Sequence, residues 1–242
     1  MVKTQAFVIH LERAAGRRAQ AESIMQRVGC ESELLAACDG KLLSQEALDQ
    51  FYPGHAIFQP SYPFKLSPVE IGCFQSHRTA WAKIVDKNLD AGIVFEDDVE
   101  IDEDVFQAAL AFAQNHIEQF GYIQFQVREL PNDCRVVFEK DKVGLYEPTV
   151  VPLRASAQLI SRKAAQRLLA VTEQIDRPID TFVQMHWLTK VAVGCVAPSG
   201  ASDRTVETGG STLSRKRSLV EKLRAEVLRA RYRYTIKKQS HL

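Results

Sequence analysis

The chain has 242 residues, of which 45% are hydrophobic and 25% charged, and its formal net charge is +1. This size and composition fit a soluble globular protein with one substantial core, or one domain followed by a tail. No run of about 18 uninterrupted apolar residues occurs, which excludes a predicted membrane-spanning helix.

Two further features predict the compartment of the protein. The amino-terminal stretch turns polar too soon for a signal peptide, so we expect a cytoplasmic location. The five cysteines are widely spaced and form no Cys-x-x-Cys pair, which argues against a disulfide framework and against a zinc site. We interpret them as reduced, mostly buried thiols.

Short apolar runs alternate with helical patterns along the first half of the chain, which is typical of an α/β layer architecture. A proline- and aromatic-rich loop at 51–65 interrupts them and is expected to be ordered or lid-like. Ser67, Pro68 and Glu70 form the signature of a capped helix start. The expected elements are a strand at 6–11, a helix at 15–28, a strand at 32–37 and a helix at 68–89.

A second group of elements follows a strand at 92–95. Asp102 suits the cap of the next helix, and Ser161 suits the cap of a later one. Pro178 begins a helix expected to carry both Asp180 and His186. The expected elements are a helix at 102–119, a strand at 122–127, short β-type segments around 136–138, 144–146 and 149–153, a strand at 157–161, a helix at 162–172 and a strand at 191–197.

The strand at 92–95 runs directly into three acidic residues, Glu96, Asp97 and Asp98. Adjacent carboxylates repel one another unless a positive group lies between them, and hard oxygen ligands suit Mn²⁺, Mg²⁺ or Ca²⁺. The alternative is that these acids only face water. Because Asp102 serves the next helix as its cap, the run is not needed for capping, and we predict a divalent-cation site that would hold substrate phosphates.

The net charge is distributed unevenly. From Arg215 to Lys238 there are ten Lys and Arg against two Glu, so the remainder of the chain has an excess of acids. The basic segment also has apolar residues at helical spacing, namely Leu219, Val220, Leu223, Val227, Leu228, Tyr232 and Ile236. A basic amphipathic helix of this kind predicts an anionic membrane surface as its partner. The alternatives are a helix that docks on the body and, less favoured because aromatics are few, nucleic acid.

Four stretches together resemble glycosyltransferase family 25, the lipopolysaccharide and lipooligosaccharide biosynthesis family related to the procollagen galactosyltransferases. The stretches are V-I-H-L-E-R-A-A-G-R-R, S-P-V-E-I-G-C-F-Q-S-H-R-T-A-W, I-V-F-E-D-D-V, and L-I-S-R-K-A-A-Q-R-L-L with the following P-I-D. The resemblance implies a single GT-A-like α/β domain over 1–213, with a mixed, mainly parallel sheet flanked by helices, and leaves 214–242 as a basic helical tail. It also implies transfer of a hexose, galactose from UDP-galactose, with inversion, onto a surface-glycan acceptor.

The resemblance implies roles for particular residues. The acidic run would hold Mn²⁺ or Mg²⁺ against the donor diphosphate through Asp98 and Glu96, with His186 completing the metal shell or simply packing beside Trp187. Asp180 would be the general base, although an acid at a helix start is also a plain stabiliser of the helix. The residues expected to bind the donor are His10, Leu11, Arg13, Arg17, Arg18, His77, Glu96 and Asp97.

Alternatives remain for several of these residues. If they do not bind the donor, the early arginines lie exposed at a solvated helix start. The alternative for His77 is a hydrogen-bonded histidine at the border of an apolar helix face. The segments at 51–65 and 149–157 are expected to contact the acceptor. Two stretches depart from the family pattern, R-A-S-A-Q-L-I-S and Y-I-Q-F-Q-V, and are expected to shape the donor pocket or the acceptor site.

Two other functions fit the same carboxylates. One is a metal-dependent phosphohydrolase or nucleotidyltransferase, and the other is a catalytically silent nucleotide- or glycan-binding module. The acidic run, the basic tail and the polar amino terminus together favour a UDP-sugar transferase held peripherally at the cytoplasmic face of the inner membrane.

Overall fold

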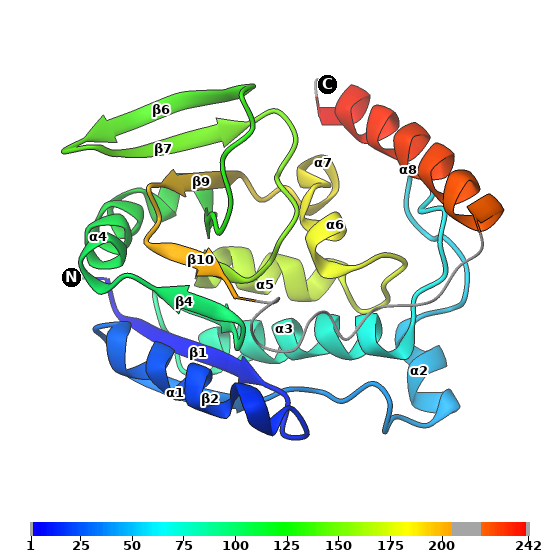
Figure 1. Cartoon of the computed structure of the whole chain (residues 1–242), viewed down its shortest axis with the longest axis horizontal. Helices are drawn as coiled ribbons and strands as arrows, with labels where there is room; N and C mark the ends of the chain where they lie inside the picture. Colours follow the sequence, from blue (N-terminus) through cyan, green and yellow to red (C-terminus); the bar gives the residue numbers. More distant parts are fainter. Residues whose placement is uncertain (1, 205–218, 241–242) are drawn as a thin grey trace.

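The computed structural model describes residues 2–204 and 219–240. Its centre is an eight-stranded sheet in the order β2-β1-β3-β8-β5-β9-β7-β6 (Figure 1). The strand pairings are parallel for β2-β1, β1-β3 and β5-β9 and antiparallel for the others, so six of these eight strands point the same way and only β8 and β7 run opposite. The predicted α/β fold with a mixed, mainly parallel sheet is confirmed.

The first half of the chain contains three parallel strands and the helices that connect them. The elements are β1 (Thr4–His10), a 3-10 turn η1 (Ala15–Arg17), α1 (Arg18–Arg27), β2 (Ser32–Ala36), α2 (Gln45–Phe51), α3 (Pro68–Asp86) and β3 (Ala91–Glu96). The chain leaves β1 to one side, toward β2, and returns on its other side as β3. This reversal of direction places a topological switch point at the carboxyl ends of β1 and β3, where α/β proteins bind their ligands.

The second half adds the mixed part of the sheet. The elements are β4 (Val99–Ile101), α4 (Glu103–Phe120), β5 (Tyr122–Phe125), β6 (Cys134–Lys140), β7 (Val143–Pro148), β8 (Ala157–Ser161), α5 (Arg162–Val171), α6 (Ile179–Val183), α7 (His186–Thr189), β9 (Val193–Ala197), β10 (Ala201–Asp203) and α8 (Leu219–Ser240). β4 and β10 form a separate two-stranded antiparallel pair. β4 begins directly after the acidic run, and the amide of Arg204, the residue after β10, donates to the Asp98 carbonyl.

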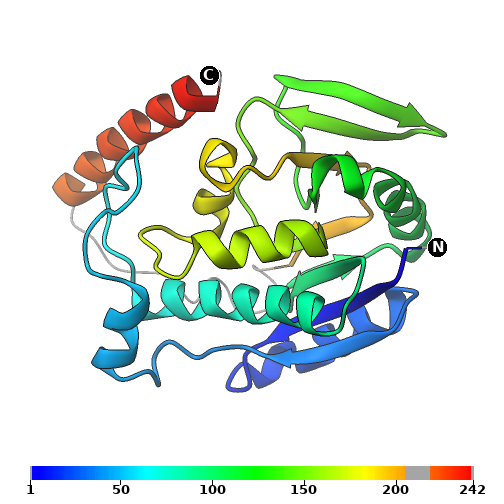
Figure 2. The ribbon, with the colours of Figure 1, turned by 180° about the vertical axis from the view of Figure 1, so that it is seen from behind.

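Helices cover both faces of the sheet, and each face has its own apolar core. α3, α5 and α6 pack on the face that carries Phe7, Val94 and Ile160. α1 and α4 pack on the face that carries Val8 and Ile93. Figure 2 shows α3 and α5 side by side across the near face. Because alternate strand residues point to opposite faces, both faces of β1 and β3 are apolar, as expected for strands buried on both sides.

The predicted helix starts are confirmed. Ser67 accepts from the Glu70 amide while Glu70 accepts from the Ser67 amide, which is a complete capping box at α3. Asp102 caps α4 and Ser161 caps α5 in the same manner, each accepting from an amide three residues on. Local sequence chemistry therefore sets where these three helices begin.

The structure differs from the predicted elements in several places. The helix α2 and the short strands β4 and β10 were not predicted, and 149–153 forms no strand. Asp180 and His186 lie on two helices instead of one, because Met185 leaves the helical region at φ −87° and ψ 55°. Met185 is fully buried, so packing overrides the local helical pattern here. Of the five free cysteines only Cys195 is buried, and the others are partly exposed.

The loop at 51–65 is ordered by a buried ion pair. Arg177 and Asp176 are both fully buried and lie 2.7 Å apart, measured from Nε to Oδ1. Asp176 accepts from the amides of Ile57 and Phe58, and Arg177 donates to the carbonyls of Phe58 and Pro60. The pair thereby attaches the middle of the loop to the segment that leads into α6.

α8 docks on the body, the alternative that the sequence left open. Ala225, Tyr232 and Ile236 are buried, and the Tyr232 hydroxyl accepts from Arg177 at 2.7 Å. The predicted apolar stripe is divided, since Leu223 and Val227 point outward. The predicted boundary at 213/214 and the side chains of Leu219 and Val220 lie outside the described residues. Among the described helices, none is long and apolar enough to cross a bilayer.

Candidate active site

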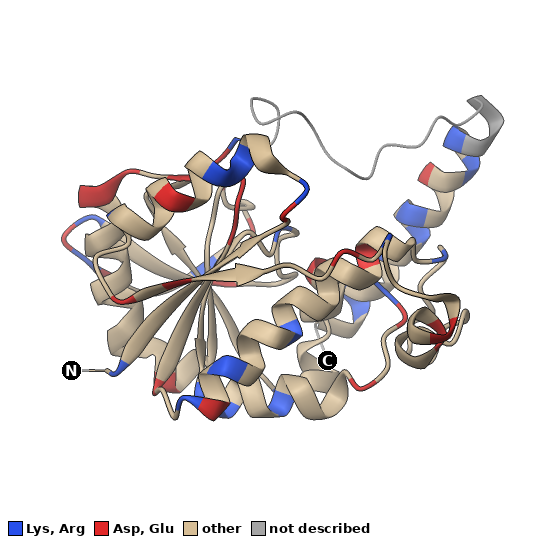
Figure 3. Cartoon of the chain, turned by 90° about the horizontal axis from the view of Figure 1, so that it is seen from below, with Lys and Arg blue, Asp and Glu red and all other residues tan. Residues whose placement is uncertain are grey.

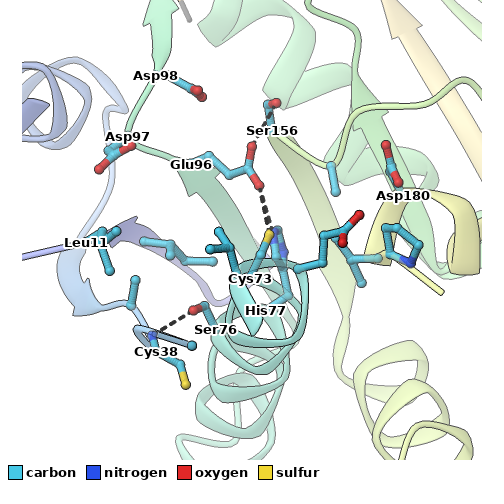
Figure 4. Close-up of a pocket in the computed structure, with 18 of the residues that line it drawn as sticks. Leu11, Cys38, Cys73, Ser76, His77, Glu96, Asp97, Asp98, Ser156 and Asp180 are labelled. Carbon is cyan, nitrogen blue, oxygen red and sulfur yellow. Dashed lines mark hydrogen bonds and ion pairs between the residues drawn. The ribbon is translucent and has the colours of Figure 1, made fainter. Parts of the chain in front are cut away.

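A cavity of about 430 Å³ opens at the switch point between β1 and β3. Its walls come from the turn after β1, the loop after β2, one face of α3, the acidic run after β3, the segment before β8 and the start of α6. Figure 4 shows the side chains of these segments converging from both sides of β3. The predicted site residues that line the cavity are Leu11, Arg13, Arg17, His77, Glu96, Asp97, Asp98 and Asp180.

The three carboxylates of the acidic run point in different directions (Figure 4). Glu96 turns toward α3 and the segment before β8, where it meets His77 and Ser156. Asp97 and Asp98 turn toward the segment after β1. Glu96 is thus separated from the two aspartates by its own partners, while Asp97 and Asp98 share Arg17.

Asp97 is held from two sides. His10, at the buried end of β1, lies 2.7 Å from Oδ2, and Arg17 donates to Oδ1 at 3.0 Å. Arg17 also lies 3.3 Å from Oδ2 of Asp98, so one guanidinium bridges both aspartates. The three charged side chains are no more than 13% exposed and together keep one net negative charge. This arrangement attracts a cation yet presents a guanidinium to an anion.

Glu96 accepts three hydrogen bonds. His77 Nε2 lies 3.3 Å from Oε1, Ser156 donates to Oε2 at 3.1 Å, and the Cys73 thiol lies 3.6 Å from Oε1. Burial opposes ionisation of Glu96, but these hydrogen bonds outweigh it and hold the pKa of Glu96 below its usual value. Burial and the Glu96 charge raise the pKa of Cys73, which keeps the thiol protonated as a donor.

His77 is oriented from behind by a buried polar chain. Gln158 of β8 donates to His77 Nδ1 at 3.1 Å, which leaves the Nε2 proton for Glu96. The Tyr122 hydroxyl of β5 in turn lies 3.1 Å from the Gln158 carbonyl oxygen. His77, Gln158 and Tyr122 are each at most 1% exposed. His77 is thus a buried, hydrogen-bonded histidine that also lines the cavity and positions Glu96, while its role in binding the donor stays a prediction.

Asp180 enters the cavity from the first turn of α6, on the other side of Glu96 from Asp97 (Figure 4). Its Oδ1 accepts from the Thr181 amide at 2.7 Å and from the Thr181 hydroxyl at 3.2 Å. Burial raises the pKa of Asp180, and the Glu96 charge adds to this effect while the Thr181 hydrogen bonds oppose it. A carboxylate with a raised pKa is a stronger base than a solvated one.

The early arginines have different places. Arg17 is at the centre of the aspartate cluster, and Arg13 pairs at the rim with Asp39, Nε to Oδ2 at 2.5 Å. Arg18 pairs with Glu22 one turn along α1 and does not line the cavity. The structure thus brings two of the three arginines to the site.

His186 does not join the acidic run. It lies at the start of α7 against Trp187, with ring centroids 5.4 Å apart, and is not among the residues that line the cavity. The charged groups that influence it are Glu147 and Lys190, while burial lowers the pKa of His186. Glu96 also faces away from Asp98, so the structure does not bring Asp98, Glu96 and His186 together as one ligand set. Among the described residues, Asp97 and Asp98 offer the oxygen ligands that a hard divalent ion prefers, whereas the ligand atoms of Cys73, His77 and Glu96, which lie within 4.8 Å of one another, include softer sulfur and nitrogen.

Several residues that shape the site were missed from the sequence. Ser156 and Gln158 face Glu96 and His77 only because β8 pairs with β3. The loop after β2 is held against α3 by Ser76, whose hydroxyl accepts from the Cys38 amide at 2.8 Å. Gly40 and Gly72 touch there, since a Cβ on Gly72 would lie 2.5 Å from the Gly40 nitrogen. Only the glycine in the I-G-C motif could have hinted at this close approach.

A family model described as "Glycosyltransferase family 25 (LPS biosynthesis protein)" matches residues 3–183. The chain belongs to glycosyltransferase family 25. The matched range ends at the last residue of α6, so it includes every residue that lines the cavity.

Curated relatives in family 25 include a Drosophila melanogaster "Glycosyltransferase 25 family member", 28% identical over 194 residues, covering 75% of this chain and 31% of that protein. Human "Procollagen galactosyltransferase 2" is 28% identical over 186 residues, covering 70% and 29%. A rat "Probable inactive glycosyltransferase 25 family member 3" is 35% identical over 111 residues, covering 44% and 19%. The chain therefore spans less than a third of the length of these relatives.

Among solved structures, "A197 from STIV" matches with a TM-score of 0.40 and 12% identity, over 80% of this chain and 81% of that one.

Proposed function

We propose that this family 25 chain transfers a hexose from a nucleoside-diphosphate sugar to a hydroxyl of a glycan acceptor. The observation that carries the proposal is the arrangement of charge in the cavity. An aspartate pair bridged by Arg17 lies at one side of Glu96, and a buried carboxylate with a raised pKa, Asp180, lies at the other. The first group suits a diphosphate and the second suits a hydroxyl that must lose its proton.

The donor diphosphate would lie beside Arg17, with Arg13 at the rim. Both guanidinium groups follow the carboxyl end of β1, and two fork-shaped donors match phosphate oxygens. Asp98 would hold Mn²⁺ or Mg²⁺ together with the phosphate oxygens, because such ions commonly take one or two carboxylates and complete their shell from the substrate. The bound ion would stabilise the charge that grows on the leaving diphosphate.

Transfer with inversion requires one displacement at the anomeric carbon. The acceptor oxygen forms the new bond as its proton passes to Asp180, and the bond between the anomeric carbon and the diphosphate oxygen breaks. Glu96, held in place by His77 and Ser156, lies between the two groups and is placed to bind a sugar hydroxyl. Its lowered pKa keeps it a hydrogen-bond acceptor at neutral pH.

Galactose from UDP-galactose is the proposed donor sugar, and a surface glycan of the lipopolysaccharide class is the proposed acceptor. The name of the human relative supports galactose, and the description of the family model supports the acceptor class. Leu153 and Tyr62, from the two segments expected to contact the acceptor, both line the cavity.

A panel of nucleotide sugars with Mn²⁺ tests the proposal. Release of UDP from one donor, lost in Asp98→Asn and in Asp180→Asn, would support transfer. The matched control is Asp90→Asn, because Asp90 lies at the opposite end of β3 and accepts from the Lys3 amide. Donor-independent phosphate release would favour a phosphohydrolase, and thermal stabilisation by UDP without turnover would favour a silent module like the relative named inactive.

A further inference from the structure

α8 has a second apolar face opposite the one that docks. Leu223, Val227 and Tyr234 are 70%, 61% and 73% exposed. At about 100° per residue these three positions fall within roughly 40° of one another, about half a turn away from Tyr232. The buried face of α8 packs against the body. The exposed stripe is not covered by any other described element.

Cations flank the exposed stripe on both sides. The seven Lys and Arg of α8 face two Glu, and Figure 3 shows the basic groups along the helix. Arg224, Arg231 and Lys238 are exposed on the same flank, and in the part of the chain that the structure describes they have no ion-pair partner. On the other flank Arg229 and Arg233 share Glu226. The outer surface of the helix is thus apolar in the middle and positive at its edges.

We propose that α8 lies along an anionic lipid bilayer through this outer surface. Leu223, Val227 and Tyr234 would enter the boundary between headgroups and acyl chains, and the flanking cations would meet the lipid phosphates. The charge and the polarity of this surface together favour a lipid bilayer as its partner. Nucleic acid would leave the apolar stripe unused, and a second copy of α8 would bring like charges together.

The orientation of α8 places the bilayer near the cavity. Its inner face contacts Tyr62 through Tyr232, with ring centroids 5.4 Å apart, and Tyr62 lines the cavity. Arg229 lies over the Phe64 ring, 5.5 Å from its centroid. An acceptor carried on a lipid would therefore meet the cavity from the side of α8. This last step rests on the proposed function, whereas attachment to the bilayer does not.

Sedimentation of the full chain with lipid vesicles tests the attachment. The chain should bind vesicles that contain phosphatidylglycerol, bind phosphatidylcholine vesicles weakly, and be released as salt is raised. The double variant Leu223→Glu/Val227→Glu should lose at least tenfold in binding. The triple variant Arg224→Gln/Arg231→Gln/Lys238→Gln should lose about a hundredfold, since each cation near an anionic surface contributes about fivefold.

The control is Leu42→Glu, which places one glutamate on an 84% exposed leucine between β2 and α2. It should bind vesicles as the unmodified chain does. Thermal unfolding should be unchanged in all three variants, because the altered side chains are exposed. Hydrolysis of a soluble nucleotide sugar should also be unchanged, which separates failure of the anchor from failure of the proposed transferase.

Equal vesicle binding by the double variant and the unmodified chain would overturn the proposal, as would no binding of either. If the unmodified chain binds DNA but not vesicles, and the triple variant no longer binds DNA, the surface would be assigned to nucleic acid instead. If the unmodified chain is a dimer and the double variant is a monomer, the surface would be assigned to a second copy of the chain.

Discussion

Replacing Arg177 with Met should cost more stability than any other single change outside the apolar core. Arg177 and Asp176 are fully buried, and the guanidinium donates to the Tyr232 hydroxyl and to the carbonyls of Phe58 and Pro60. Methionine has a similar volume but no donors. The substitution therefore leaves a buried carboxylate and three buried acceptors without this partner.

The magnitude follows from these contacts. Removing one member of a buried ion pair costs about 3–5 kcal/mol, because the remaining charge loses its compensation. Asp176 still accepts from the amides of Ile57 and Phe58, which keeps the loss within that range. With a urea m-value of about 2–3 kcal/mol/M, the unfolding midpoint should fall by about 1–2.5 M.

Urea unfolding followed by circular dichroism measures this change, and Arg18→Met is the matched control. Arg18 pairs with Glu22 one turn away at the surface, so the control should change the free energy of unfolding by no more than about 0.5 kcal/mol. The double variant Asp176→Asn/Arg177→Met should lose less than the single one, since no unpaired charge remains. A loss below about 1 kcal/mol for Arg177→Met would refute the reasoning.

Three other predictions concern the cavity. Asp180→Asn should lower the rate of sugar transfer about 10²- to 10⁴-fold. Because burial raises the pKa of Asp180, the unmodified chain should lose stability as pH rises through that pKa, whereas Asp180→Asn should not. His77→Ala should be less stable than the parent at neutral pH, and since His77 helps to hold the pKa of Glu96 below 4.5, the difference in urea midpoint should shrink as pH falls below 4.5. Gly72→Ala should lower the free energy of unfolding by about 1–3 kcal/mol, because the new methyl group would lie 2.5 Å from the Cys38 carbonyl oxygen. Gly16→Ala, where a methyl group would meet nothing within 4 Å, should leave it unchanged, and thermal unfolding of both variants measures the difference.

Features encoded within a few residues were predictable from the sequence. The cap at Ser67, the cap at Asp102 and the buried strand that ends at Glu96 all depend on neighbours within one turn or one strand. The resemblance assigned Arg17 and Asp98 separately to the donor diphosphate, and the pairing of β1 with β3 brings them within 3.3 Å of one another.

The support behind these residues was not predictable. Gln158 reaches His77 because β8 pairs antiparallel with β3 and places Val94 opposite Gln158, and no local pattern specifies that register. The separation of His186 from the acidic run depends likewise on the break at the buried Met185. Both features arise from packing between segments that are distant in sequence.

The polar chain from Tyr122 through Gln158 and His77 to Glu96 determines how the site would fail on heating. These groups are anchored in β5, β8, α3 and β3, and the first three are almost completely buried. Their amides should exchange with solvent only when the whole domain opens, since core elements unfold last. Arg13 and Arg17 lie on a short surface segment, so the side of the cavity proposed to bind phosphate should loosen while the wall around Glu96 is still intact.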